Sequence, residues 1–265
     1  MRQTGCTQRR ASHLYLAVGL SLTAVLVSCT SRVSGPDKSG VDPCTVVTPY
    51  TLGATTDGRL ATNDCQLADG SYIDYYSTTL TGGWYQFDMT AGFSTYLVLR
   101  TADRTAIGVH DDVGHGANTM LKALLPAGSY ILDANAYPGS SGAYTLSSAL
   151  TTTAVTNCEV VFVAKGTSTT QSLETTDCNA GTSYSDDYII YIASNQSITV
   201  TLSSSAFDAY LELYGVPGRV AVNDNYSSTG TDARLTFTSP VGDFFVLRAE
   251  SAAGFVTGAY TIDIQ

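Results

Sequence analysis

The amino-acid sequence predicts an all-β protein made of two tandem antiparallel β-sandwich domains behind an N-terminal export signal. Three observations carry this prediction. Glycine and tyrosine are abundant, at 24 and 17 of 265 residues, and serine and threonine are common, which favours strands and turns over helices. Apolar and polar residues alternate with a period of two in several segments. A series of short motifs occurs twice, about 113 residues apart.

Residues 1–28 have the pattern of an export signal. The basic pair Arg9-Arg10 precedes an uncharged, mostly apolar run from Leu14 to Val27. This run is too short for a comfortable membrane span and has the proportions of a signal peptide. It ends in Leu26-Val27-Ser28-Cys29, which resembles the bacterial lipobox, and the resemblance implies that Cys29 is diacylated. The alternative interpretation is an ordinary secretory signal whose cleavage site contains a cysteine.

The segment after the signal, residues 29–43, is predicted to be a lipidated cysteine followed by a flexible tether. It contains serine, glycine and proline and has no apolar periodicity. Acyl chains on Cys29 would hold the protein at a membrane. We therefore expect a lipid-anchored protein of the bacterial cell envelope, placed at the outer membrane if the host is Gram-negative.

Four further cysteines predict two disulfides. Cys44 and Cys65 are 21 positions apart, and Cys158 and Cys178 have nearly the same spacing. An even set of cysteines in an exported chain is typical of disulfides. No pair has the CxxC spacing and no histidine is close, so a zinc site is not favoured. The predicted pairs are Cys44–Cys65 and Cys158–Cys178.

The cysteine spacing exposes an internal repeat that divides the chain into two domains. Residues 44–150 form the first copy, residues 158–265 form the second, and residues 151–157 form the linker. Besides the cysteines, five anchors recur in the same order. The paired anchors are Asp74-Tyr75 and Asp187-Tyr188, Phe93–Leu99 and Phe207–Leu213, Val109–Asp112 and Val222–Asn225, Pro126–Tyr130 and Pro240–Phe244, and Gly142–Leu146 and Gly258–Ile262.

Period-two alternation predicts strands that are half-buried. In the second copy the apolar positions alternate with polar ones in three runs, and Phe244–Leu247 lacks alternation and is expected to be buried on both faces. The alternating apolar positions are Ile198, Val200 and Leu202; Leu235 and Phe237; and Tyr260, Ile262 and Ile264. The predicted turns between strands are Thr81-Gly82-Gly83, Pro126-Ala127-Gly128 and Pro217-Gly218.

In this order the motifs resemble the bacterial pre-peptidase C-terminal domain. The second copy carries the pattern best, with Phe207–Leu213, Asn223-Asp224 and Gly258–Ile262, whereas the first copy has Ser94 and His110 where the family usually has Asp and Asn. The resemblance implies jelly-roll-like β-sandwiches. It also implies an accessory module for substrate attachment, secretion or stability, without the protease domain that usually accompanies it.

Some members of that family bind calcium, and oxygen-bearing side chains suit this ion. The candidate ligands are Asp208, Asn223 and Asp224 in the second copy and Asp111 and Asp112 in the first. The alternative is that these residues form Asx-turns and cap exposed backbone N–H groups. No other cofactor is expected.

Catalysis is not predicted. Only His110 and His115 follow the signal segment, in a predicted polar loop, and no Gly-x-Ser-x-Gly motif occurs. Once the disulfides form, no cysteine remains as a nucleophile. The net charge of −10 makes nucleic acid a poor partner.

The aromatic residues of the first copy suggest a binding surface. Tyr75, Tyr76, Trp84 and Tyr85 crowd one expected hairpin, and adjacent residues of a strand point to opposite faces, so some rings should face outward. Exposed tyrosine and tryptophan can stack on sugars or grip an extended polypeptide. The alternative is that the rings are half-buried as in many exported β-proteins.

Two functions from different classes follow. The first is a non-catalytic binding or adhesion module for an extracellular polysaccharide or protein. The second is a purely structural or interaction lipoprotein of the envelope, or an accessory module of a secreted hydrolase system. Retention on an envelope or extracellular polymer separates them.

Overall fold

The computed structural model describes residues 14–15, 21–22, 42–111, 118–151, 161–179, 181–216, 218–227 and 230–265. Within these ranges the chain is built of β-strands, and the one helical element is a 3-10 turn, η1 (Pro43–Thr45). The prediction of an all-β fold is confirmed. Cys29 and almost all of the expected linker lie outside the described residues. No helix in the described part of the chain is long and apolar enough to cross a membrane.

The first half is a β-sandwich dominated by two long strands that pair with each other, β6 and β9. Near the N-terminus, β1 (Leu14–Tyr15) and β2 (Ser21–Leu22) form a separate antiparallel pair. The strands of the first sandwich are β3 (Thr48–Pro49), β4 (Thr55–Leu60), β5 (Cys65–Gln66), β6 (Tyr72–Ala91), β7 (Thr95–Thr101), β8 (Ala106–Asp111), β9 (Thr119–Ala136) and β10 (Gly142–Thr151).

The second half repeats this plan with shorter strands. Its strands are β11 (Val161–Val163), β12 (Thr167–Leu173), β13 (Cys178–Asn179), β14 (Tyr184–Ile192), β15 (Ser197–Ser203), β16 (Ala209–Tyr214), β17 (Arg219–Asn223), β18 (Ala233–Thr238), β19 (Asp243–Ser251) and β20 (Gly258–Ile264). The predicted alternation is confirmed here, since Ile198, Val200 and Leu202 of β15 are all buried. The run Phe244–Leu247 of β19 is buried throughout, also as predicted.

Two of the predicted turns are wrong. Gly82-Gly83 lies inside β6 and Pro126 lies inside β9, and the two sites face each other across the paired strands. Gly82 and Gly83 have φ of 93° and 132°, which glycine adopts without strain. Because the two breakers are opposite, both strands bend at the same level and continue from one sheet of the sandwich into the other.

In the second half the equivalent site is a true break. Thr238 ends β18 and Asp243 begins β19, with Pro240 between them, so two separate strands correspond to the single β9. In the same way β14 and β15 correspond to the two parts of β6. The third predicted turn lies between β16 and β17, where the Gly215 N–H donates to the Gly218 carbonyl at 2.9 Å.

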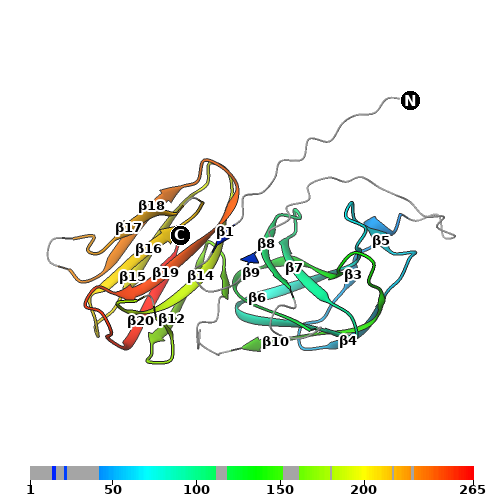
Figure 1. The fold of residues 1–265 in the computed structure, drawn as a ribbon, viewed down its shortest axis with the longest axis horizontal. Coiled ribbons are helices and arrows are strands. Elements are labelled where there is room, and N and C mark those ends of the chain that lie inside the picture. Colours follow the sequence, from blue (N-terminus) through cyan, green and yellow to red (C-terminus); the bar gives the residue numbers. More distant parts are fainter. Residues whose placement is uncertain are drawn as a thin grey trace.

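The two halves share one continuous sheet, which the sequence pattern did not predict. β11 pairs in parallel with β14 of its own half and with Ala123–Leu124 of β9. Figure 1 shows β9 and β14 on the adjoining sides of the two halves. Val161 and Val163 of β11 pack into the core of the second half, whereas Phe162 packs into the core of the first. Three residues therefore join the edges of both sandwiches.

Each core also receives side chains from the other half. Trp84 and Leu124 belong to the core of the second half, and Ile189 and Phe244 belong to the core of the first. The Phe162 and Phe244 rings meet edge to face, with 6.4 Å between their centroids. Apolar surface that each sandwich would otherwise expose is thus buried between them.

A buried tyrosine pair marks the true register of the repeat. Tyr144 donates a hydrogen bond to Asp74 and contacts the Tyr76 hydroxyl, with both oxygen–oxygen distances 2.6 Å. In the second half Tyr260 donates to Asp186 at 2.5 Å and contacts the Tyr188 hydroxyl. Asp74 is therefore equivalent to Asp186, one residue away from the sequence-based pairing with Asp187. A shift of one residue exchanges the two faces of a strand, so this correction decides which side chains are compared.

Candidate functional site

The expected outward-facing aromatic platform is wrong for three of its four residues. Trp84 is 8% exposed, Tyr85 is fully buried and Tyr76 is 6% exposed. Tyr76 and Tyr85 point into the core of the first half, and the second half covers Trp84 on the other face of β6. The Trp84 indole N–H donates to the Thr169 hydroxyl of the second half at 3.1 Å. Tyr75 alone is half-buried on the outside of the sandwich.

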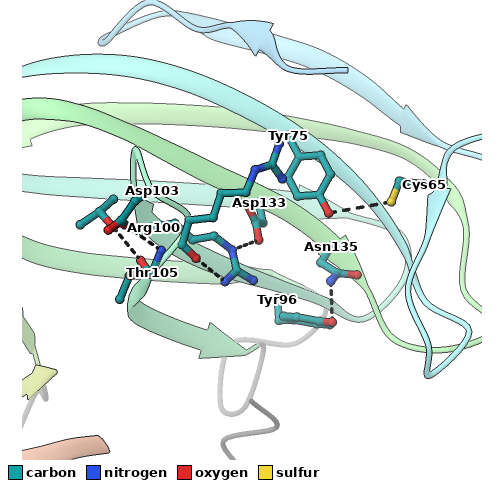
Figure 2. Close-up of polar contacts among 10 residues, drawn as sticks. Cys65, Tyr75, Tyr96, Arg100, Asp103, Thr105, Asp133 and Asn135 are labelled. Carbon is teal, nitrogen blue, oxygen red and sulfur yellow. Dashed lines mark hydrogen bonds and ion pairs between the residues drawn. The ribbon is translucent and has the colours of Figure 1, made fainter. Parts of the chain in front are cut away.

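Around Tyr75 lies a cluster that we call the polar face. It is the side of β6, β9 and β7 that points away from the core, and Figure 2 shows how its side chains converge. Alternation along β9 places Leu132 and Ala134 in the core and Asp133 and Asn135 on the opposite side. The members of the polar face are Tyr75, Tyr96, Arg100, Arg104, Asp133 and Asn135.

The floor of the polar face consists of two fully buried polar side chains. Arg100 Nε donates to Asp133 Oδ2 at 2.5 Å, and Asn135 Nδ2 donates to the Tyr96 hydroxyl at 2.5 Å. The remaining oxygens, Asp133 Oδ1 and Asn135 Oδ1, have no hydrogen-bond partner. A buried acceptor without a donor costs about 1–3 kcal/mol. Two such acceptors lie on successive outward positions of β9.

Burial also governs the acid–base chemistry of this floor. Desolvation raises the pKa of Asp133 to about 6, although Arg100 and Arg104 act in the opposite direction. Burial likewise raises the pKa of Tyr96 to about 12. Tyr96 therefore stays a neutral hydroxyl near neutral pH, whereas Asp133 titrates close to that range.

The rim is formed by the hairpin turn between β7 and β8. The Arg104 N–H donates to the Thr101 carbonyl and the Thr101 N–H to the Thr105 carbonyl, each at 2.9 Å. This geometry gives Arg104 a φ of 68°, in the region that favours glycine. Its guanidinium lies over the Tyr75 ring, 4.7 Å from the centroid. An exposed arginine thus covers the Tyr75 ring, which is one of the two half-buried tyrosine rings of the polar face.

The equivalent face of the second half is a natural comparison. The strand registers match Asp187 to Tyr75, Arg248 to Asp133 and Glu250 to Asn135. Arg248 donates to both oxygens of Asp187, at 2.7 and 2.8 Å, and Ser183 donates to Glu250. Neither Asp187 nor Glu250 has an unpartnered oxygen. The second half nevertheless has buried polar atoms without a partner as well, among them Ser185 Oγ, and Ser185 lies opposite Glu250 in the ladder.

The predicted disulfide Cys44–Cys65 is present, with an S–S distance of 2.06 Å. Cys65 Sγ lies 3.8 Å from the Tyr75 hydroxyl, so this cross-link borders the polar face. Cys178 is disulfide-bonded, and its predicted partner Cys158 lies outside the described residues.

The candidate calcium ligands differ in their contacts and in their exposure to solvent. Asn223 Oδ1 accepts the backbone N–H of Arg234 at 2.9 Å, which is the capping role of the alternative interpretation. Asp208 precedes β16, and Asp224 is exposed beyond β17. In the described ranges no three His, Cys, Asp or Glu side chains gather as a metal site would require. Asp112, the side chain of Asp111, and both candidate histidine side chains lie outside the described residues.

Sequence reasoning named Tyr75 but missed Asp133, Asn135, Arg100, Arg104 and Tyr96. The alternation of residues along Tyr130–Ala136 predicts that Asp133 and Asn135 are ordinary positions facing solvent. The available signal was their residue type, because aspartate and asparagine are depleted in strands.

No protein-family profile and no curated protein matches this chain. Among solved structures, 39% of the chain is similar to the pre-peptidase C-terminal domain of a collagenase from Bacillus anthracis, of which it covers 94%, with 16% identity and a TM-score of 0.31. The PBSX exported protein XepA is similar over 82% of this chain and 89% of its own, with 12% identity and a TM-score of 0.27. The CUB1-EGF-CUB2 domains of rat MASP-1 are similar over 82% of this chain and 100% of their own, with 8% identity and a TM-score of 0.25.

Proposed function

We propose that this protein is a non-catalytic binding module for an extracellular polymer or protein, held at the bacterial cell envelope by lipid on Cys29. Its ligand surface is the polar face of the first half. The observation that carries the proposal is the pair of buried, unpartnered acceptors, Asp133 Oδ1 and Asn135 Oδ1, beside half-buried tyrosines. Both oxygens are buried in the unbound protein, so a ligand reaches them only when the side chains that cover them move, and its donors then recover the free energy that the unpartnered oxygens cost.

The arrangement of the sandwich supports this role. β6, β9 and β7 are consecutive hydrogen-bonded strands, so the polar face is fixed by ladders on a rigid sheet. The second half packs against the other end of β6 through Trp84 and leaves the polar face outside the joint. The molecule thus presents a fixed surface with its floor already formed, which lowers the entropy cost of binding.

A retention experiment tests the binding function. The protein is incubated with insoluble polymers, namely peptidoglycan sacculi, chitin, cellulose and collagen fibrils, and the fraction that remains in the supernatant is measured. Asn135→Leu removes the open acceptor and keeps the number of side-chain heavy atoms, and Glu250→Leu places leucine at the corresponding position of the second half. We expect retention on at least one polymer, its loss in Asn135→Leu, and its preservation in Glu250→Leu, with all three proteins folded by circular dichroism. Equal retention by both variants refutes the assignment of the polar face.

A fractionation experiment tests the anchor. Cys29→Ser removes the acceptor of the lipid, and the acidic chain has no concentrated basic patch in residues 29–43 to bind anionic headgroups. The wild type should pellet with membranes, and Cys29→Ser should be recovered in soluble form with an unchanged melting temperature. A Cys29→Ser protein that still pellets after a high-salt wash contradicts the lipoprotein proposal.

A further inference from the structure

We propose that the Cys44–Cys65 disulfide is a mechanical brace, which keeps a pull on the N-terminal tether from detaching the strands β3 and β4. The proposal takes one point from the proposed function, namely the lipid on Cys29, which makes residues 29–43 the segment that carries load. It goes beyond binding, because it concerns how the anchored protein withstands that load. Three observations carry it: the position of the disulfide, the attachment of the strands that it encloses, and the core that those strands cover.

The disulfide lies where the tether meets the first sandwich. Cys44 is in the 3-10 turn η1, and the Asp42 carboxylate accepts the Cys44 N–H at 3.0 Å. Cys65 begins β5, which pairs with β6. Because β3 and β4 lie between the two cysteines, the cross-link closes a covalent ring that contains both strands. A pull on the tether therefore reaches β5 through the disulfide as well as along the chain.

The enclosed strands are held by few partners. β3 forms two parallel pairs with β6, at Tyr76 and Ser77. Among the described strands β4 pairs with β10 alone, so it is the free edge of its sheet. A strand that has one neighbour can open from its end, one residue pair after another. Without the disulfide, β3 and then β4 are the first strands of the sandwich that a pull from the tether would meet.

β3 and β4 nevertheless cover part of the core of the first half. Leu60 of β4 is fully buried, and Tyr50, directly after β3, is buried in the same core. The Tyr50 hydroxyl donates to the Ser148 hydroxyl of β10 at 2.9 Å. The Tyr144 ring packs directly on the backbone of Gly58, where a Cβ would lie 2.2 Å from the ring. Detachment of these strands therefore opens the core of the first half.

A pulling force favours a transition in proportion to the length that the chain gains in it. Without the cross-link, detaching the segment between the two cysteines, which are 21 positions apart, lengthens the tether by up to about 70 Å. The disulfide holds the Cα atoms of Cys44 and Cys65 4.5 Å apart. With the disulfide closed, detachment of β3 and β4 adds almost no length, so the force does not favour it.

This role differs from ordinary stabilisation by a disulfide. A cross-link that only restricts the unfolded chain stabilises the protein whatever the point at which force is applied. A brace matters when the pull comes from the tether, because only that pull loads the segment between Cys44 and Cys65. The direction of the pull therefore separates the two roles.

The test is single-molecule force spectroscopy on the full-length Cys29→Ser protein, which carries no lipid. One handle is at the C-terminus, and the other is either at the N-terminus or at Ala102, which is exposed in the turn between β7 and β8. The comparison is with the same protein that also carries Cys44→Ala and Cys65→Ala, after circular dichroism has shown whether it is folded. The measured quantities are the force and the contour-length gain of each unfolding event.

With the disulfide present, we expect the pull from the N-terminus to show no step before a sandwich unfolds. Without it, the same pull should give an early step of about 70 Å in contour length, at a lower force than any event in the disulfide-bonded protein. The pull from Ala102 should show no such early step in either protein.

An early step of this kind in the disulfide-bonded protein overturns the proposal, whether or not the cysteine variant folds. A folded variant without the early step also overturns it, and an equal loss of unfolding force for both pulling points then identifies the disulfide as an ordinary stabiliser. The lipid anchor is decided separately by the fractionation of the wild type and Cys29→Ser, because the pulling experiment uses no lipid.

Discussion

In each half a buried tyrosine donates a hydrogen bond to a carboxylate, and the tyrosine pair of the second half is the more deeply buried. Tyr188 and Tyr260 are almost completely buried, and Asp186 accepts from Tyr260. Desolvation raises the pKa of Asp186; the hydrogen bond from Tyr260 lowers it, the carboxylates Asp177, Asp187 and Glu174 raise it, and the result is a pKa of about 8. A neutral Asp186 is therefore the state that the folded protein prefers near neutral pH.

This preference predicts that Asp186 makes stability fall as pH rises. The unfolded chain releases this proton near pH 4, whereas the folded protein holds it to about pH 8. Below pH 4 the two states bind the same proton, so the contribution of Asp186 is fully present there. Between about pH 4 and 8 it is lost progressively, by roughly 1 kcal/mol per pH unit. Asp186→Asn keeps an acceptor for Tyr260 and removes the titration.

The measurement is urea unfolding of wild type and Asp186→Asn at several pH values. The variant should gain stability over the wild type as pH rises from 4 to 8. Taking the difference between the two proteins cancels the other titrating groups, including Glu212, whose pKa is lowered by its contacts with Tyr214 and Arg219. A difference that does not depend on pH would show that Asp186 is ionised in the folded protein throughout.

At the scale of whole strands, β6 shows what alternation reveals and what it conceals. Period-two patterning correctly placed the core face of the strands in the second half. It could not show that Gly82-Gly83 is a bend inside a strand, because that depends on Pro126 being opposite in β9. It also could not show that Trp84 is covered, because the covering residues belong to the other half of the chain.

Trp84 is therefore predicted to be a stability determinant. It is buried in the core of the second half and donates to Thr169, although it belongs to a strand of the first. Trp84→Ala should lower the free energy of unfolding by about 3–5 kcal/mol, as expected for truncation of a large buried aromatic side chain. Chemical denaturation followed by far-UV circular dichroism measures this loss.

A matched control is Leu150→Ala, because Leu150 is 59% exposed and its truncation should cost less than about 0.5 kcal/mol. If Trp84→Ala is as mild as Leu150→Ala, the indole does not pack between the halves in solution. The expected retention on polymers is the same for Trp84→Ala as for the wild type, provided that both are folded under the assay conditions, since Trp84 is not part of the polar face.

At the scale of the whole molecule, much of the architecture could be predicted from the sequence. The all-β class, the repeated motifs and the Cys44–Cys65 pair follow from local pattern and spacing. The predicted register of the repeat is wrong by one residue, because Asp186 and Asp187 are adjacent in the sequence and only the hydrogen bond from Tyr260 distinguishes them. The pairing of β11 with strands of both halves could not be predicted, because Val161–Val163 is too short to show periodicity and its partner strands are far away in the sequence.

That join predicts how the molecule unfolds. Phe162 belongs to the core of the first half and contacts Phe244 of the second, while Val161 and Val163 of the same strand pack into the second core. Each half therefore loses packing when the other unfolds, and the wild type should unfold in one cooperative transition. Phe162→Ala removes the ring that couples the two cores without breaking the ladder of β11. It should lower stability by about 3–5 kcal/mol and separate the transitions of the two halves.

The single tryptophan allows the two events to be distinguished, because Trp84 lies at the joint and reports its opening. In the wild type, tryptophan emission and far-UV circular dichroism should give coincident unfolding curves, with emission that starts from a blue-shifted maximum. In Phe162→Ala the emission should change at lower denaturant than the dichroism, since the joint opens before both sandwiches have unfolded. Coincident curves in Phe162→Ala would mean that the remaining contacts of β11 and Trp84 couple the halves on their own, and the role assigned to Phe162 would be wrong.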